Sequence, residues 1–192
     1  MLIDRRSLLL GAAATGAAAL SGARADDGPM LTADGLYREP WFLQSFLNLG
    51  DDLETARSEG KRFAVMWELK GCPYCKETHL VNFADPRIAD YIKANFEITQ
   101  LNIIGSLKVT DIDGTEMREK ELAAKYGVRY TPTFQFFGED AAKLKTLPPK
   151  EREVARIPGY LRPDDFLGVF RYVREKGYEK GRLRDFMKNQ AS

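Results

Sequence analysis

The segment FAVMWELKGCPYC occupies residues 63–75 and contains both cysteines of this 192-residue chain. Its apolar start, residues 63–67, is typical of a short buried strand. Cys72 and Cys75 follow that strand directly, with two residues between them. Two thiols at this spacing, placed where a strand gives way to a helix, favour thiol–disulfide exchange as the function.

The two cysteines are expected to have different roles. Pro73 suits the first turn of a helix, because its missing N–H would have no intrahelical partner there. Cys72 would then lie at the helix N-terminus, where unpaired N–H groups and the helix dipole favour the reactive thiolate. We therefore predict that Cys72 is the nucleophile and that Cys75 resolves the mixed disulfide. A lone Cys-x-x-Cys pair also matches half of a zinc site, so its context must decide.

The N-terminus predicts an export signal in residues 1–25. Two adjacent arginines, residues 5–6, precede an apolar, alanine-rich stretch that ends in a small-x-small pattern at Ala25. This order is typical of a cleaved signal peptide. The arginine pair resembles a twin-arginine signal, although Asp4 stands where serine or threonine is usual. We expect cleavage after Ala25 and a periplasmic protein; the alternative, an uncleaved membrane anchor, would need a longer apolar stretch.

Charge and cysteine content argue against two roles, nucleic-acid binding and a structural disulfide. Basic and acidic residues nearly balance, at 29 against 28, and no basic block is interleaved with aromatic residues. This distribution argues against nucleic acid as a partner. The length fits one domain with a good core, and we expect a monomer. A disulfide between Cys72 and Cys75 closes too small a loop to stabilise the fold much, so its value is expected to be chemical.

The order of predicted elements indicates an α/β fold. Helices are expected at residues 51–60, 73–83, 88–94, 117–126 and 163–177, and strands at 63–69, 96–103, 133–137 and 154–158. A small hairpin is expected around residues 110–114, and a solvated, charged loop at 143–152. Alternating strands and helices, followed by a late pair of strands, imply a central mixed β-sheet flanked by helices on both faces.

Three segments of the chain, in this order, resemble the thioredoxin superfamily. They are the strand with its CPYC motif at residues 72–75, residues 126–134, and residues 157–160 before the last helix. The resemblance implies a thioredoxin-like fold and the activity of a thiol–disulfide oxidoreductase. It also implies that the chain divides into a thioredoxin-like domain and two flanking segments.

The thioredoxin-like domain would span residues 45–178, with an insertion at about residues 104–117. An N-terminal extension, residues 26–44, and a C-terminal tail, residues 179–192, lie outside it. The insertion, a Pro-Gly-Tyr segment and an aromatic-rich last helix most resemble periplasmic thioredoxins of the SoxW type. That resemblance implies a connection to bacterial sulfur oxidation.

The same resemblance implies further site residues around the cysteines. Thr131 and Pro132 would form a cis peptide where the backbone pairs with an extended substrate segment; a trans proline starting an edge strand is the alternative. Pro73 and Tyr74 match the dipeptide of glutaredoxins, whose potentials of about −200 to −230 mV are milder than the roughly −270 mV of thioredoxin. We expect a mild reductant that needs no cofactor beyond its own redox-active disulfide.

The partners implied are protein disulfides and a membrane electron donor of the DsbD/CcdA type. In an oxidising compartment no soluble buffer would keep the dithiol reduced. Roles in sulfur oxidation or cytochrome maturation follow from the resemblance. The opposite direction, a disulfide-forming oxidase, usually goes with a large helical insertion for peptide binding, and no segment here is long enough.

Glu68 is the candidate proton relay for Cys75. Thioredoxins bury an aspartate six residues before the first cysteine, where this chain has Met66. Glu68 lies two residues further along the same strand, so its side chain points to the same face. A buried carboxylate there would suit the role of a base. The alternative is a solvated glutamate at the end of a strand.

His79 is the only histidine and lies four residues after Cys75, on the same face of the predicted helix. Cys72, Cys75 and His79 offer donors for copper or zinc, which makes a metal-binding chaperone an alternative function. Zinc normally needs a fourth ligand, and none is evident. We expect His79 to be an ordinary helix residue. A third alternative is a partner-binding module whose thiols are incidental.

Overall fold

The computed structural model describes residues 28–190 of the chain. The predicted export signal at residues 1–25 lies outside this range, as do the last two residues of the predicted tail. Among the helices of residues 28–190, none is long and apolar enough to cross a membrane.

The elements follow in chain order. The strands are β1 (Met30–Leu31), β2 (Tyr37–Arg38), β3 (Arg62–Glu68), β4 (Phe96–Asn102), β5 (Lys108–Thr110), β6 (Glu116–Arg118), β7 (Thr133–Phe137) and β8 (Glu153–Pro158). The helices are α1 (Leu49–Ser58), α2 (Pro73–Glu77), the π-helical turn η1 (Thr78–Asn82), α3 (Pro86–Asn95), α4 (Glu119–Lys125), α5 (Ala141–Thr146), α6 (Pro149–Arg152), α7 (Pro163–Arg174), α8 (Gly177–Lys180) and α9 (Leu183–Gln190).

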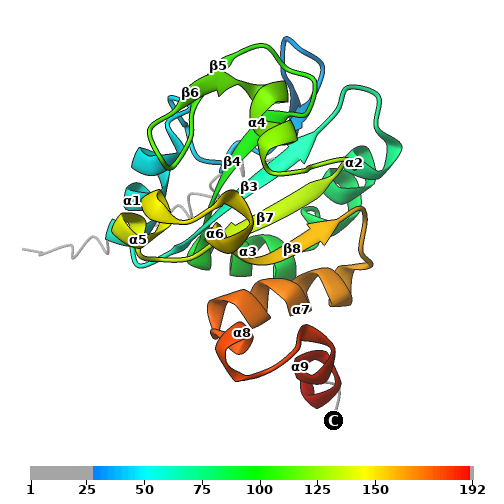
Figure 1. Cartoon of the computed structure of the whole chain (residues 1–192). Coiled ribbons are helices and arrows are strands. Elements are labelled where there is room, and N and C mark those ends of the chain that lie inside the picture. The colour runs from blue at the N-terminus through cyan, green and yellow to red at the C-terminus, as the bar shows by residue number, and fades with distance from the viewer. Residues whose placement is uncertain (1–27, 191–192) are drawn as a thin grey trace, which may run out of the picture.

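Strands β4, β3, β7 and β8 form the central sheet in that order (Figure 1). β3 pairs in parallel with β4, whereas β7 is antiparallel to both β3 and β8. The sheet is therefore mixed, as the sequence predicts. Two small antiparallel pairs lie apart from it: β1 with β2 in the segment predicted as an N-terminal extension, and β5 with β6, which overlap the predicted insertion.

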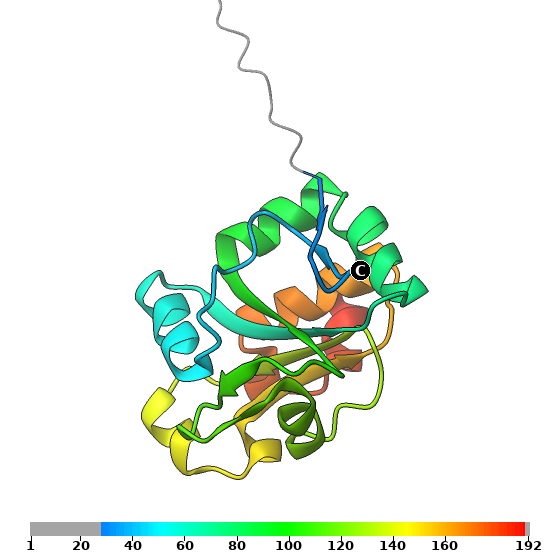
Figure 2. The same cartoon turned by 90° about the horizontal axis from the view of Figure 1, so that it is seen from above.

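Hydrophobic cores cover both faces of the sheet. Successive residues of a strand point to opposite faces, and all 7 residues of β3 are buried. Met66 belongs to the core that includes residues of α3 and α7, whereas Val65 and Trp67 belong to the core beneath α1 and α4. Figure 2 shows helices on the two sides of the sheet, which confirms the predicted α/β architecture.

The helical segment after the cysteines differs from the prediction. The pattern predicts one α-helix over residues 73–83, but the chain forms the short helix α2 and then the π-helical turn η1. The predicted break follows, where Asp85 caps α3 by accepting from the Arg87 N–H at 2.9 Å. π-Helical turns are rare and are frequent at functional sites. This one contains His79.

Pairing and packing correct two other predictions. The helix predicted over residues 117–126 begins at Glu119, because Met117 pairs with Val109 in the β5–β6 hairpin. Residues 143–152 are not a solvated loop, because they contribute to α5 and α6, and Arg152 is buried. In the tail, residues of α9 pack against the core that includes α7.

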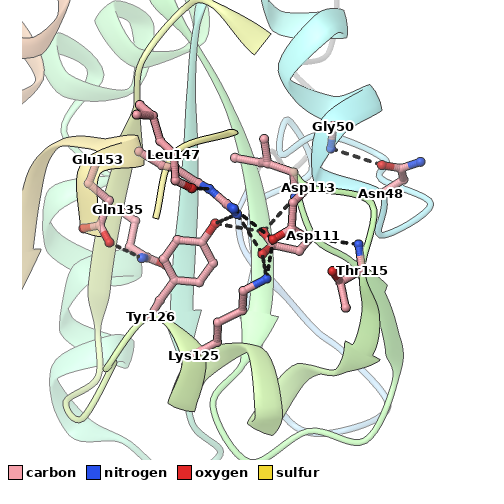
Figure 3. Close-up of polar contacts among 12 residues, drawn as sticks. Asn48, Gly50, Asp111, Asp113, Thr115, Lys125, Tyr126, Gln135, Leu147 and Glu153 are labelled. Carbon is pink, nitrogen blue, oxygen red and sulfur yellow. Dashed lines mark hydrogen bonds and ion pairs between the residues drawn. The ribbon is translucent and has the colours of Figure 1, made fainter. Parts of the chain in front are cut away.

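A buried ionic network surrounds Arg152 and joins the insertion to α4 and α6. Arg152 donates to Asp111 at 2.9 Å, to Asp113 at 2.8 Å and to the Tyr126 hydroxyl at 3.0 Å. Lys125 reaches the same two carboxylates at 2.5 and 2.6 Å. In Figure 3, Asp111, Asp113, Lys125 and Tyr126 point toward one another. Burial raises the pKa of Asp113, but hydrogen bonds from Lys125 and Arg152 outweigh it and hold that pKa below its usual value.

Arg152→Met is expected to lower the free energy of unfolding by about 3 kcal/mol, since it removes one partner of a buried ion pair. The Asp111 carboxylate would remain buried with Lys125 as its remaining cation. Chemical denaturation measures the loss. The exposed pair of Arg57 with Glu54 supplies the control, because Arg57→Met should cost less than about 1 kcal/mol. Equal small losses for both variants would contradict a structural role for the network.

Candidate active site

Cys72 is the accessible thiol of the pair. It is the N-cap residue of α2, and its Sγ accepts a hydrogen bond from the Cys75 backbone N–H at 3.2 Å. The Cys72 thiol also donates to the Thr131 carbonyl oxygen at 3.4 Å. A backbone N–H directed at sulfur stabilises negative charge on it. The geometry therefore suits a nucleophile at Cys72.

Cys75 lies behind Cys72 and is only 3% exposed. Burial raises the pKa of its thiol well above the usual range, and the hydrogen bond with Cys72 and the charge of Glu68 add to the increase. Both cysteines are free thiols. Cys75 is thus a protonated thiol that needs a base before its sulfur can attack.

The Thr131–Pro132 peptide bond is cis, which confirms that prediction. Because the Cys72 thiol donates to the Thr131 carbonyl, the cis peptide bond lies beside the reactive sulfur. Pro132 is buried, and its carbonyl oxygen accepts from the Gly159 N–H at 2.7 Å. Two segments far apart from the cysteines in sequence therefore meet at the site.

Tyrosine rings lie on the exposed side of the site. Tyr74 is 55% exposed and stacks on Tyr160, with 6.1 Å between ring centroids and 18° between ring planes. Tyr130, next to Thr131, is 67% exposed. Sequence reasoning did not single out Tyr130 or Tyr160, although both belong to the segments that carry the resemblance. These rings offer apolar surface to a bound polypeptide.

Glu68 is buried at the end of β3. It is 1% exposed, so the alternative of a solvated glutamate is wrong. Its Oε1 lies 3.1 Å from His79 Nε2, and its Oε2 accepts a hydrogen bond from Gln100 Nε2. Its charge acts on the thiol of Cys75. Glu68 is therefore a buried carboxylate in the electrostatic neighbourhood of Cys75.

His79 is not an ordinary helix residue, and that prediction is wrong. The side chain is fully buried, with Nδ1 2.7 Å from Glu39 Oε1 and Nε2 3.1 Å from Glu68 Oε1. Since carboxylates engage both ring nitrogens, the ring has no free lone pair for a metal ion shared with the cysteines. Within residues 28–190, no group of three or more His, Cys, Asp or Glu side chains is arranged to hold a metal ion.

Glu39 is the residue of this site that sequence reasoning missed. It follows β2 in the N-terminal extension and is 2% exposed. Figure 2 shows the extension, in blue, beside the helical segment that contains His79. The only signal in the sequence is one acid directly before Pro40 and the apolar residues 41–43. That signal does not identify a partner.

The fold and the dithiol site together define a thioredoxin-like protein. Residues 49–174 match the family described as Thioredoxin-like domain, so the chain belongs to that family. This match confirms the predicted superfamily and the thioredoxin-like fold. Comparison with curated proteins finds no match.

Comparison with solved structures gives the following similarities. A thioredoxin-fold protein from Helicobacter pylori is 21% identical with a TM-score of 0.55, over 69% of this chain and 85% of its own. A thioredoxin from Thermus thermophilus is 27% identical with a TM-score of 0.48, over 66% of this chain and 84% of its own. The periplasmic thioredoxin SoxS from Paracoccus pantotrophus is 19% identical with a TM-score of 0.39, over 61% of this chain and 99% of its own.

Proposed function

We propose that this protein is a periplasmic thiol–disulfide oxidoreductase that reduces disulfide bonds in other proteins. The asymmetry of its two thiols carries the proposal. Cys72 is accessible and receives an N–H hydrogen bond, whereas Cys75 is buried behind it. Membership of the thioredoxin-like family supports the same conclusion.

The reaction has two exchange steps. In the first, the Cys72 thiolate attacks a substrate disulfide, and one substrate sulfur leaves as a thiolate while the other stays bonded to Cys72. In the second, Cys75 gives its proton to Glu68 and its sulfur attacks Cys72 Sγ. The second substrate sulfur then leaves as a thiolate. The substrate gains two electrons, and the Cys72–Cys75 disulfide is the only redox group required.

The cis Thr131–Pro132 segment and the exposed tyrosines would bind the substrate polypeptide. An extended substrate segment would pair with the backbone at Thr131, and Tyr74 and Tyr160 would contact its side chains. Backbone pairing gives affinity with little dependence on sequence. Such a site accepts many protein disulfides.

Electrons would return from a membrane thiol–disulfide protein of the DsbD/CcdA type. This direction fits a mild reductant in an oxidising compartment. The substrates would belong to sulfur oxidation, as the resemblance to SoxW-type thioredoxins implies, or to cytochrome maturation. The twin-arginine-like segment of residues 1–25 would direct the chain to the periplasm, where it would act as a monomer.

The proposal predicts that the purified protein accelerates the reduction of insulin by dithiothreitol. Precipitation of the freed insulin chains measures the rate. The matched control is the same protein after alkylation of Cys72, the accessible thiol, which should behave like buffer. Equal rates with the native and the alkylated protein would contradict the proposed function.

A further inference from the structure

Three buried side chains form a hydrogen-bonded row that ends at Glu68, whose charge acts on Cys75. Glu39, His79 and Glu68 come from three separate segments: the N-terminal extension, the π-helical turn η1 and strand β3. Their side chains are 3%, 0% and 1% exposed. His79 lies between the two carboxylates, at 2.7 Å from Glu39 and 3.1 Å from Glu68.

The number of hydrogen bonds determines how many protons this row holds. A neutral imidazole has one N–H and can donate to only one of two carboxylates. Both contacts are hydrogen bonds only if the three groups hold one additional proton, on His79 or on a carboxyl. An unpaired charge would be costly at this burial. The row therefore holds one proton more than a neutral imidazole between two carboxylates, and one net negative charge.

The surroundings favour that proton on His79. The rings of Tyr37, Phe42 and Phe83 contact the imidazole on its other sides. Glu39 and Glu68 are the charged groups that act on it most strongly. Burial lowers the pKa of His79, but the two carboxylates outweigh burial and hold that pKa above its usual value.

We propose that Glu39 and His79 are positioning residues that hold Glu68 as an ionised base beside Cys75, so that the N-terminal extension is part of the redox centre. The inference rests on the proposed function, in which Glu68 receives the proton of Cys75. Without the imidazolium, two carboxylates would lie buried together and at least one would take up a proton. Glu68 would then act as a base only in those molecules in which the proton lies on Glu39.

The proton transfer from Cys75 to Glu68 leaves the net buried charge unchanged during the second exchange step. Before the transfer, Glu68 is negative and the Cys75 thiol is neutral. After it, Glu68 is neutral and the Cys75 sulfur is negative, while Glu39 and His79 are unchanged. The sulfur then bonds to Cys72, and the negative charge leaves on the substrate thiolate.

The first test is NMR of the wild-type ring, because His79 is the only histidine in the chain. Its nitrogen-15 signals need no assignment by mutation. We expect both ring nitrogens to carry protons at pH 7 in the dithiol protein. A neutral ring at pH 7, with one protonated nitrogen, would overturn the proposal.

The second test is Glu39→Gln, which keeps the shape of the side chain and removes its charge. The pKa of His79 should fall by about 1–3 units, the usual effect of losing a close opposite charge. Dithionitrobenzoate separates the two exchange steps, because attack by Cys72 releases one thionitrobenzoate and attack by Cys75 releases the second. At pH 8 we expect His79→Gln, which leaves both carboxylates buried without the imidazolium, to slow the second release at least about twofold, because the shared proton then lies on Glu68 in part of the molecules. The first release should stay unchanged.

The control is Asp52→Asn, which alters a buried carboxylate on α1, across the sheet from the row. It should change neither release. Equal slowing of both releases by His79→Gln, no slowing, or an unchanged pKa of His79 in Glu39→Gln would overturn the inference and leave the proposed function intact. Absence of a second release from the wild-type protein would instead contradict the proposed function itself.

Discussion

Cys72→Ser is expected to abolish reduction of protein disulfides, whereas Cys75→Ser should keep the first attack and trap the substrate. The serine hydroxyl is not a nucleophile toward disulfides at neutral pH, so no mixed disulfide forms without Cys72. Without Cys75 the mixed disulfide on Cys72 has no internal thiol to release it. The insulin assay should show no activity above buffer for either variant.

Mass spectrometry of each variant with an oxidised substrate distinguishes the two thiols. Cys75→Ser should gain the mass of one substrate chain, and dithiothreitol should remove it. Cys72→Ser should gain none, because the remaining thiol is 3% exposed. Trapping by Cys72→Ser instead of Cys75→Ser would reverse the assigned roles. Activity in both variants would show that the thiols are incidental.

Glu68→Gln is expected to slow release of the second product by about 10²–10⁴-fold, the usual contribution of a positioned general base. Burial raises the pKa of Cys75, so without the base only its thiolate fraction can react. As long as the pH is below the pKa of Cys75, that thiolate fraction grows tenfold for each unit by which the pH rises. The second release should therefore become steeply dependent on pH in the variant, with a shallower dependence in the wild type.

The dithionitrobenzoate experiment measures both releases for Glu68→Gln. The rate of the first release should match that of the wild type, because the Cys75 backbone N–H, and not Glu68, stabilises the Cys72 thiolate. Glu97→Gln is the control, since that carboxylate pairs with Lys61 at the start of β4. It should leave both releases unchanged. A wild-type rate of second release in Glu68→Gln would exclude Glu68 as the base.

The sequence predicts the parts of this protein that local patterns encode. The apolar run before the cysteines predicts β3, and the spacing of Cys72 and Cys75 predicts which thiol is accessible. The two-residue period of a strand also puts Glu68 on the face of Met66. Each of these inferences needs only neighbouring residues, and the buried side chain of Glu68 agrees with the last of them.

The parts that the sequence does not predict depend on contacts between distant segments. His79 and Glu39 are 40 positions apart, and nothing in either local pattern indicates that they meet. The π-helical turn that holds His79 has no signal in hydrophobic periodicity, which cannot separate it from an α-helix. Arg152 lies in a charged stretch that resembles a solvated loop until its partner, Asp111, is known.

The equilibrium reduction potential of the Cys72–Cys75 pair tests the central claim most directly. Alkylation of the protein across dithiothreitol or glutathione redox buffers, followed by mass spectrometry, gives the fraction of dithiol. A mild reductant should have a potential between about −270 and −200 mV, the range of thioredoxins and glutaredoxins. A potential near −120 mV, that of a strong oxidant, would contradict the direction of electron flow. Failure to form a reversible disulfide would contradict the redox function altogether.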